Sequence, residues 1–194
     1  MIVPIVMASD ENYLLPTCVT IISILENGSG NNTYYVYMLV NRQNVDMDKG
    51  VFSKIKQRYP NFEYRYLRID EELFANAVTI NYHTTVETFY RLIISDLLPE
   101  YDKCLYLDGD LLVRCDVAEL LIVDMNIDYL AAVRDIGTQC GQGVYYTRHQ
   151  EELGFGSMES YFNAGVLVLN LAQIRKDNMA PLFLRAIENK YTLE

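Results

Sequence analysis

The first seventy residues alternate between apolar strand-like runs and helix-like patterns, and this order constrains the fold more than any other feature. Ile2 to Ala8 is an uninterrupted apolar run with β-branched residues, typical of a strand buried on both faces. Tyr34 to Val40 and Phe62 to Ile69 predict two further strands. Helical patterns over Leu14 to Leu25 and Val45 to Tyr59 separate the strands. The β-α-β-α-β order predicts an α/β protein with a mainly parallel mixed sheet flanked by helices.

The rest of the chain continues this alternation with shorter elements. The sequence first predicts a helix over Thr84 to Leu98 and a strand over Lys103 to Leu107, with Leu111 to Val113 as a candidate extension of that strand. A short helix capped by Asp116, a strand over Tyr129 to Arg134 and a long loop over 136–160 are predicted next. The sequence ends with a predicted strand over Val166 to Leu169 and a predicted helix over Leu171 to Tyr191 that is broken at Pro181. No repeat or linker divides the sequence, so residues 1–194 are predicted to belong to one domain.

The charge balance is strongly acidic. The 194 residues include 16 Lys and Arg against 26 Asp and Glu, a net charge of −10, and 51% of the residues are hydrophobic. The apolar fraction excludes wholesale disorder. The charge argues against a nucleic-acid partner, because phosphate backbones bind basic surfaces. A phosphate ligand remains compatible if a metal ion lies between it and the acidic side chains.

Cysteine usage and the apolar runs predict a soluble, cytoplasmic protein. Cys18, Cys104, Cys115 and Cys140 include no C-x-x-C pair, and only two histidines accompany them, so a zinc site is not expected. We expect buried thiols in a reducing compartment rather than a disulfide framework. The sequence shows neither a signal-peptide pattern nor an apolar run long enough to cross a bilayer.

A pair of carboxylates follows the predicted strand over Lys103 to Leu107. Asp108-Gly109-Asp110 begins where this strand ends, and ligand sites of open α/β sheets gather beyond the carboxyl ends of the strands. A bend at Gly109 would let both carboxylates approach one divalent cation, which could bridge to a diphosphate. Taken alone, the motif is a weak signal, and a turn with two solvated aspartates is its simpler interpretation. Its position directly after four buried apolar residues favours a functional role.

Other candidate ligands lie near the ends of predicted elements. Asp10 and Asn12, after the first strand, could bond a nucleobase or ribose, and Tyr13 could stack on a base; plain turn chemistry is the alternative. Arg91 lies beside the apolar face of its predicted helix, so it is either solvated or reaches a phosphate.

The small residues before the last predicted strand form a further candidate. Asn163-Ala164-Gly165 would allow a sugar to approach the backbone closely, or would simply form a turn into the strand. His83 and His149 have no partner at metal-ligand spacing, and a surface position is the simpler interpretation of His149.

Taken together, these pieces resemble glycosyltransferase family 8, the group containing the bacterial lipooligosaccharide α-galactosyltransferases and glycogenin. The matching blocks are Val6 to Tyr13 (VMASDENY), Phe89 to Leu92 (FYRL), Leu105 to Asp110 (LYLDGD) and Tyr161 to Asn170 (YFNAGVLVLN). The resemblance covers essentially the whole sequence. It implies a GT-A fold, which is a Rossmann-like nucleotide-diphospho-sugar transferase fold. It also implies retaining transfer of galactose or glucose from a UDP-sugar to a saccharide or lipid-linked saccharide, in lipopolysaccharide or other surface-glycan synthesis, with Mn²⁺ or Mg²⁺ as the cofactor.

The resemblance also implies roles for individual residues. Ala8, Asp10, Asn12 and Tyr13 would hold the uridine end; Arg91 would contact the diphosphate or donor sugar; Asp108 would touch sugar, ribose or metal beside Gly109; Asp110 would ligate the metal; Asn163, Ala164 and Asp135 would line the donor-sugar pocket; and His83 would lie near the acceptor.

The sequence departs from the family pattern after its last block. Family members continue with an Asp-Gln pair and a His-x-x-Gly-x-x-Lys-Pro-Trp segment, which supply a metal ligand and a diphosphate contact, and neither is present here. The resemblance therefore implies the N-terminal portion of a GT-A catalytic domain whose C-terminal part is absent. We expect this portion to be weakly active or inactive alone. Any contact with the inner face of the membrane would come from the missing part.

Two other classes of function compete with a transferase. A non-catalytic sugar-nucleotide-binding protein fits the missing segments. A phosphohydrolase with an aspartate nucleophile is disfavoured because Leu112 stands where that class has Thr or Val. A sugar nucleotidyltransferase would need a glycine-rich basic loop after the first strand, where this chain has the acidic Ser9 to Asn12.

Overall fold

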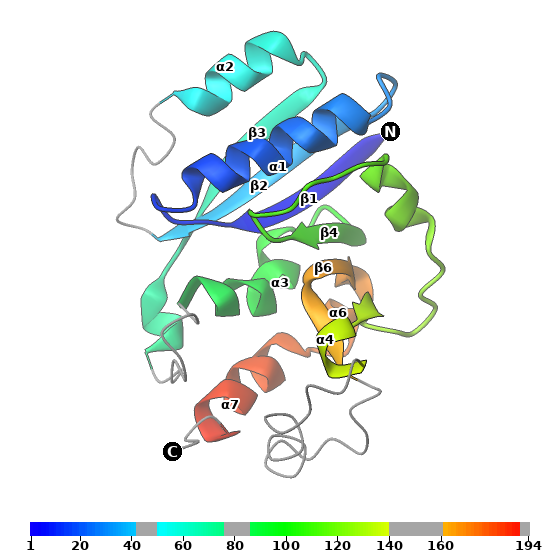
Figure 1. The fold of residues 1–194 in the computed structure, drawn as a ribbon. Coiled ribbons are helices and arrows are strands. Elements are labelled where there is room, and N and C mark those ends of the chain that lie inside the picture. Colours follow the sequence, from blue (N-terminus) through cyan, green and yellow to red (C-terminus); the bar gives the residue numbers. More distant parts are fainter. Residues whose placement is uncertain (42–49, 76–85, 140–160, 191–194) are drawn as a thin grey trace.

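A six-stranded sheet in the order β3-β2-β1-β4-β6-β5 forms the centre of the molecule (Figure 1). The computed structural model describes residues 1–41, 50–75, 86–139 and 161–190. The strands are β1 (Ile2–Ala8), β2 (Thr33–Asn41), β3 (Phe62–Ile69), β4 (Lys103–Leu107), β5 (Leu130–Arg134) and β6 (Phe162–Asn170). All six predicted strands are present, and the predicted α/β class is confirmed.

The sheet is mixed: its first four strands in spatial order run parallel to one another, and β6 runs antiparallel to both of its neighbours. β1 pairs in parallel with β2 and β4, and β2 pairs in parallel with β3. β6 runs antiparallel to both β4 and β5. The first residues of β6 therefore lie at the same edge as the last residues of β4 and β5, which is the edge where the predicted site residues lie.

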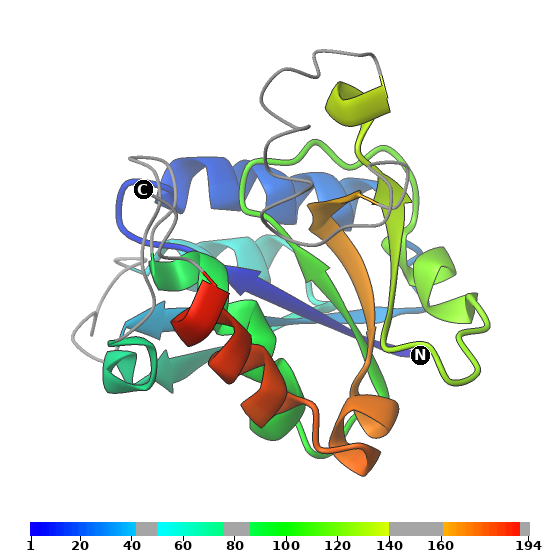
Figure 2. The same ribbon diagram turned by 90° about the horizontal axis from the view of Figure 1, so that it is seen from below.

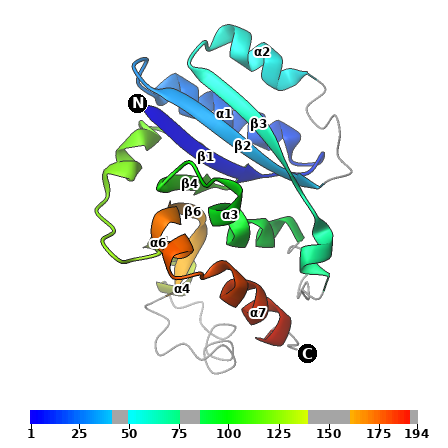
Figure 3. The ribbon, with the colours of Figure 1, turned by 180° about the vertical axis from the view of Figure 1, so that it is seen from behind.

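Helices cover both faces of the sheet (Figures 2 and 3). One face carries α1 (Leu14–Asn27), α2 (Val51–Arg58) and the 3₁₀ segment η3 (Val117–Ile122). The other carries the 3₁₀ segments η1 (Glu71–Phe74) and η2 (Val86–Ile93), then α3 (Ile94–Leu97), α6 (Leu171–Lys176) and α7 (Ala180–Lys190). α4 (Ile136–Gln139) follows β5.

The central strands alternate their side chains between two apolar clusters. In β1, Ile5 and Met7 pack in the cluster under α1, whereas Val6 packs in the cluster under η2 and α3, and all three are fully buried. Burial on both faces explains why Ile2 to Ala8 is apolar without interruption.

The predicted extension of β4 over Leu111 to Val113 is wrong. These residues form no strand, because their backbone groups bond to side chains of α1. Leu111 N–H donates to Thr20 Oγ1 over 2.9 Å, and Val113 N–H donates to Ser23 Oγ over 3.0 Å. Hydroxyl groups of α1 thus satisfy the backbone amides that a neighbouring strand would otherwise satisfy.

One predicted helix is divided, and the predicted break in the C-terminal helix is present but lies earlier in the sequence. The segment predicted over Thr84 to Leu98 is η2 followed by the single turn of α3, and residues 84–85 lie outside the described residues. The C-terminal helix breaks between Lys176 and Ala180, where Asn178 has φ 52°. Pro181 lies in the first turn of α7 rather than at the break, because the amides of a first turn need no helical acceptor.

Smaller expectations have mixed outcomes. Asp116 caps η3 as predicted, accepting from Ala118 N–H over 2.9 Å. Cys18 and Cys104 are buried as expected, but Cys115 is exposed because it lies in the irregular segment after β4. Residues 42–49 and 140–160, which include Cys140 and most of the predicted long loop, lie outside the described part. Within the described part, no helix is long and apolar enough to cross a membrane.

Candidate functional site

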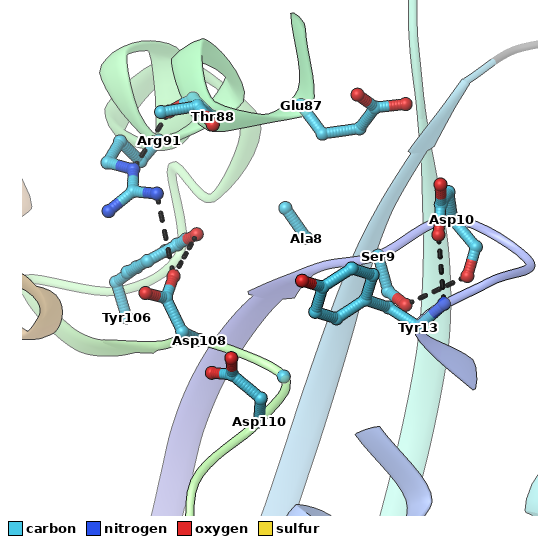
Figure 4. A pocket seen from close by; sticks show the side chains of 11 residues that line it. Ala8, Ser9, Asp10, Tyr13, Glu87, Thr88, Arg91, Tyr106, Asp108 and Asp110 are labelled. Atoms are coloured by element: carbon cyan, nitrogen blue, oxygen red, sulfur yellow. Dashed lines mark hydrogen bonds and ion pairs between the residues drawn. The ribbon is translucent and has the colours of Figure 1, made fainter. Parts of the chain in front are cut away.

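Two adjoining cavities open at the carboxyl edge of the sheet, one on each side of Arg91 and Asp108. The first, of about 200 Å³, is lined by Ala8, Ser9, Asp10, Tyr13, Glu87, Thr88, Arg91, Tyr106, Asp108, Gly109 and Asp110 (Figure 4). The second, of about 510 Å³, is lined by Thr88, Phe89, Arg91, Leu92, Asp108, Asp135, Tyr161, Phe162, Asn163, Ala164, Gly165 and Ile187. Thr88, Arg91 and Asp108 border both.

Arg91 is braced from three directions at this boundary. Its Nε donates to Thr88 O over 2.8 Å, one Nη donates to Ala164 O, and the other Nη lies 3.5 Å from Asp108 Oδ1. The side chain is 15% exposed. A guanidinium has five N–H donors, so these three contacts leave one donor on each terminal nitrogen without a partner among the described residues. Arg91 therefore has a fixed orientation and two donors available to an anion.

Tyr106 supports both members of the Arg91–Asp108 pair. Its ring lies under the guanidinium, with 4.3 Å between Cζ and the ring centroid, and its hydroxyl donates to Asp108 Oδ1 over 3.0 Å. Burial raises the pKa of Tyr106, so the hydroxyl stays protonated and remains a donor. We did not single out Tyr106 from the sequence. The signal was available, because residues two apart on a strand share a face.

The Asp108-Gly109-Asp110 turn directs both carboxylates to the same side (Figure 4). Asp110 is exposed and has no hydrogen-bond or ion-pair partner in the described part of the chain. Asp108 uses Oδ1 for Arg91 and Tyr106, and its Oδ2 lies against Gly165, where an added Cβ would come within 2.5 Å. Carboxylate oxygens are the ligands that Mn²⁺ and Mg²⁺ take, so the donor chemistry fits such an ion.

The two carboxylates do not form a complete metal site by themselves. No group of three or more His, Cys, Asp or Glu side chains suited to a metal is found among residues 1–41, 50–75, 86–139 and 161–190. An ion at Asp108 and Asp110 would therefore take its remaining ligands from other groups, such as phosphate oxygens or water.

The loop after β1 combines turn chemistry with a lining role. Asp10 accepts from Tyr13 N–H over 2.9 Å and from Asn12 Nδ2 over 3.1 Å, which closes the turn into α1. The ring of Tyr13 is half exposed and borders the first cavity together with Ala8. Asn12 is exposed and lines neither cavity; it contacts Asp10 instead.

The start of β6 and the end of β5 form the far wall of the second cavity. Asp135, Asn163 and Ala164 lie there, and Asn163 Oδ1 accepts from Gly165 N–H over 2.8 Å. Asn163 to Gly165 belong to β6 itself rather than to a turn before it, because this strand begins at Phe162 and pairs with β5 there.

Several lining residues were not predicted, and one predicted site residue, His83, lies outside the described residues. The unpredicted ones are Ser9, Glu87, Thr88, Phe89, Leu92, Tyr106, Tyr161, Phe162 and Ile187. Most of these residues lie in η2 or at the start of β6. The position of β6 depends on its antiparallel pairing with β4 and β5. His149 also lies outside the described residues.

The sequence matches one family model over nearly its whole length. The model for glycosyl transferase family 8 matches residues 4–192. The chain belongs to glycosyltransferase family 8. The four sequence blocks that resemble this family each contribute residues to the two cavities at the carboxyl edge of the sheet.

The curated relatives of this chain have low sequence identity to it and are longer than it is. A putative glycosyltransferase of Haemophilus influenzae is 29% identical over 96% of this chain and 54% of its own length. A lipopolysaccharide 1,2-glucosyltransferase of Escherichia coli is 26% identical over 93% of this chain and 51% of its own length. The chain thus spans about half the length of these curated relatives.

Two solved glycosyltransferases share the fold at 25% identity. The apo structure of the bifunctional enzyme WbbM has a TM-score of 0.79 and is aligned over 96% of this chain and 34% of its own. An active-site mutant of LgtC has a TM-score of 0.77 over 98% of this chain and 66% of its own. The family 8 chain described here therefore has the GT-A fold.

Proposed function

We propose that residues 1–194 are the nucleotide-sugar-binding portion of a single GT-A catalytic domain, and that the whole protein is a retaining UDP-sugar hexosyltransferase. The transferred hexose would be galactose or glucose, and the acceptor a saccharide or lipid-linked saccharide of lipopolysaccharide or another surface glycan. Family membership and the lipopolysaccharide glucosyltransferase among the relatives support this proposal. LgtC, which shares the fold, has also been solved with donor and acceptor sugar analogues.

The observation that carries the proposal is the braced guanidinium of Arg91 between two cavities. A nucleotide sugar has a nucleoside at one end, a sugar at the other and a diphosphate between them. The two cavities meet at Arg91 and Asp108, where two N–H donors of the guanidinium remain available. A diphosphate at this boundary would place the nucleoside in the first cavity and the sugar in the second.

The lining residues suit those two ends. In the first cavity the half-exposed ring of Tyr13 can stack on a base, and Asp10 keeps lone pairs free to accept from a base or ribose. In the second cavity Asp135 and Asn163 offer polar groups to sugar hydroxyls.

Charge near the diphosphate would be offset by Arg91 and by a cation. Mn²⁺ or Mg²⁺ at Asp108 and Asp110 would act as a Lewis acid that stabilises negative charge on the leaving diphosphate. Arg91 orients the diphosphate and Tyr106 holds Arg91 and Asp108 in place. We propose a cytoplasmic site of action at the inner face of the membrane, where such acceptors are made.

Isothermal titration calorimetry with UDP, with and without Mn²⁺, tests the proposal. We expect wild type to bind UDP more tightly with Mn²⁺, and Asp110→Asn to lose that enhancement. Arg91→Ala should weaken UDP binding roughly 10–100-fold in either condition, since charged hydrogen bonds contribute about 1.5–3 kcal/mol. Asp102→Asn is the matched control, because Asp102 is an exposed aspartate at the opposite end of β4.

Two outcomes would contradict the proposal. One is the absence of Mn²⁺-dependent UDP binding by wild type. The other is phosphate release from p-nitrophenyl phosphate that depends on Asp108, which would indicate the phosphohydrolase instead. UDP binding by a longer protein that contains this chain, without sugar transfer to any saccharide, would favour the non-catalytic binding protein.

A further inference from the structure

One side of α1 is polar although most of it is buried. Thr17, Thr20, Ser23 and Asn27 follow one another at intervals of three or four residues, so they lie along the same side of the helix. Thr17 and Thr20 are fully buried and Ser23 is 7% exposed. Buried hydroxyls need hydrogen-bond partners, so this side of α1 must face a polar surface.

The facing surface is the backbone of the Asp-Gly-Asp turn and the segment after it. Thr20 Oγ1 lies 2.9 Å from Gly109 O and 2.8 Å from Leu111 O, and it accepts from Leu111 N–H over 2.9 Å. These contacts hold the peptide groups on both sides of Asp110. The carboxylate of Asp110 has no partner of its own in the described residues, so its position depends on the backbone that carries it.

The rest of the polar side extends the same contact. Ser23 Oγ accepts from Val113 N–H over 3.0 Å, and Asn27 Nδ2 donates to Val113 O over 3.1 Å. At the other end an added Cβ on Gly109 would come within 2.5 Å of Thr17 Oγ1, so the turn lies directly on the helix. α1 therefore holds the whole segment from Gly109 to Val113.

The same helix also contacts the loop after β1. α1 begins immediately after Tyr13, and Thr17 Oγ1 lies 3.1 Å from Ser9 Oγ. Ser9 and Tyr13 line the first cavity on one side, and Gly109 and Asp110 line it on another. One rigid helix thus sets the distance between the two walls.

We propose that Thr20 is a positioning residue that fixes Asp110 relative to the loop formed by residues 9–13. This inference rests on the proposed function, because it concerns the metal-dependent part of nucleotide binding. Thr20→Val keeps the shape of the side chain but leaves Leu111 N–H without its acceptor, and it removes the one hydroxyl proton that lies within reach of both Gly109 O and Leu111 O. The turn would then move to reach water, and Asp110 would move with it.

The test compares UDP affinity with Mn²⁺ and with EDTA in wild type and three variants. In Thr20→Val we expect the enhancement by Mn²⁺ to fall about 10-fold, whereas UDP affinity in EDTA stays at the wild-type value, because the residue 9–13 loop is unchanged. Thr20→Ser keeps the hydroxyl and should keep the wild-type enhancement. Ser23→Ala is the matched control: it removes a buried hydroxyl that bonds the same segment, but three residues beyond Asp110.

The controls separate positioning from a general loss of stability. If Ser23→Ala lowers the enhancement as much as Thr20→Val does at similar unfolding free energies, the role of Thr20 is only structural and the inference is overturned. An unchanged enhancement in Thr20→Val also overturns it. If Thr20→Val does not fold, Gly109→Ala decides, since its Cβ would lie 2.5 Å from Thr17 Oγ1 and would push the turn away from α1 while the Thr20 hydroxyl is kept. An unchanged enhancement in Gly109→Ala overturns the inference. If wild type shows no Mn²⁺ enhancement, the proposed function fails first.

Discussion

The two halves of the sheet differ in packing and in what they contribute to the cavities. The inner half, β3-β2-β1-β4, is parallel, and β1 and β4 are buried on both faces. The outer half, β6 and β5, is antiparallel, and the last three residues of β5 are exposed, with Val133 at 63%. The inner half carries most of the core, whereas the outer half carries one wall of the second cavity.

This difference separates the residues that stabilise the fold from those that complete the site. β5 and the start of β6 add little buried apolar surface, although Leu167, Val168 and Leu169 later in β6 are buried. The start of β6 nevertheless supplies Ala164 O, which accepts from Arg91, and Gly165, which lies against Asp108. Substitutions in the inner half should therefore change stability most. Substitutions at the start of β6 should change ligand binding at nearly constant stability.

A matched pair of leucines tests the packing side of the comparison and should give the largest effect. Leu105 in β4 is fully buried, whereas Leu130 in β5 is half buried. Leu105→Ala should lower the free energy of unfolding by about 3 kcal/mol, and Leu130→Ala by about 1 kcal/mol, because less apolar surface and a smaller cavity are involved. Denaturant unfolding measures both. Equal losses would show that the outer half is as tightly packed as the inner one.

A substitution of Asp116 tests a carboxylate that has only a structural role beside the inner half of the sheet. It accepts from Tyr34 OH over 2.8 Å, Ser29 N–H over 3.1 Å, Asn32 Nδ2 over 3.1 Å and Ala118 N–H over 2.9 Å. An amide has one acceptor oxygen in place of two, so Asp116→Asn leaves some of these donors unpaired. We expect a loss of about 2 kcal/mol in unfolding free energy from the lost cap and the partly buried donors.

The pH dependence of stability follows from the same contacts. Burial alone would raise the pKa of Asp116, but its four hydrogen bonds outweigh burial, and the net pKa lies below the ordinary value of 3.8. The ionised form therefore stabilises the fold at pH above about 4, and this contribution is lost as the pH falls through the lowered pKa. Asp116→Asn should flatten that acid limb. Asp110→Asn is the control: its side chain is exposed, and we expect a stability change within about 0.5 kcal/mol.

Gly165 tests the site side of the comparison and should give the smallest change in free energy. An added Cβ would come within 2.5 Å of Asp108 Oδ2, the end of a movable side chain, so the carboxylate would shift while the strand stays. We expect Gly165→Ala to weaken Mn²⁺-dependent UDP binding about 10-fold, equivalent to about 1.4 kcal/mol. Gly30→Ala is the matched control, because nothing lies within 4 Å of its added Cβ. Equal UDP affinity in the two variants would show that Asp108 tolerates the displacement.

Much of the inner half follows from local sequence patterns. The apolar run of β1, the strands over Phe62–Ile69 and Lys103–Leu107, and the cap at Asp116 all have the predicted positions. These features depend on residues close together in the sequence, so periodicity and capping residues indicate them directly. The segment from Leu111 to Val113 escaped prediction because its partners, on α1, lie about ninety residues earlier.

The sequence by itself determined the order of the elements and the presence of two carboxylates directly after a buried strand. It also indicated the family through four short blocks. Only the tertiary structure decided that β6 runs antiparallel, because strand pairing depends on hydrogen bonds between distant segments and leaves no periodic signal along either one. That direction brings Ala164 and Gly165 beside Arg91 and Asp108, and so places one guanidinium at the boundary of two cavities.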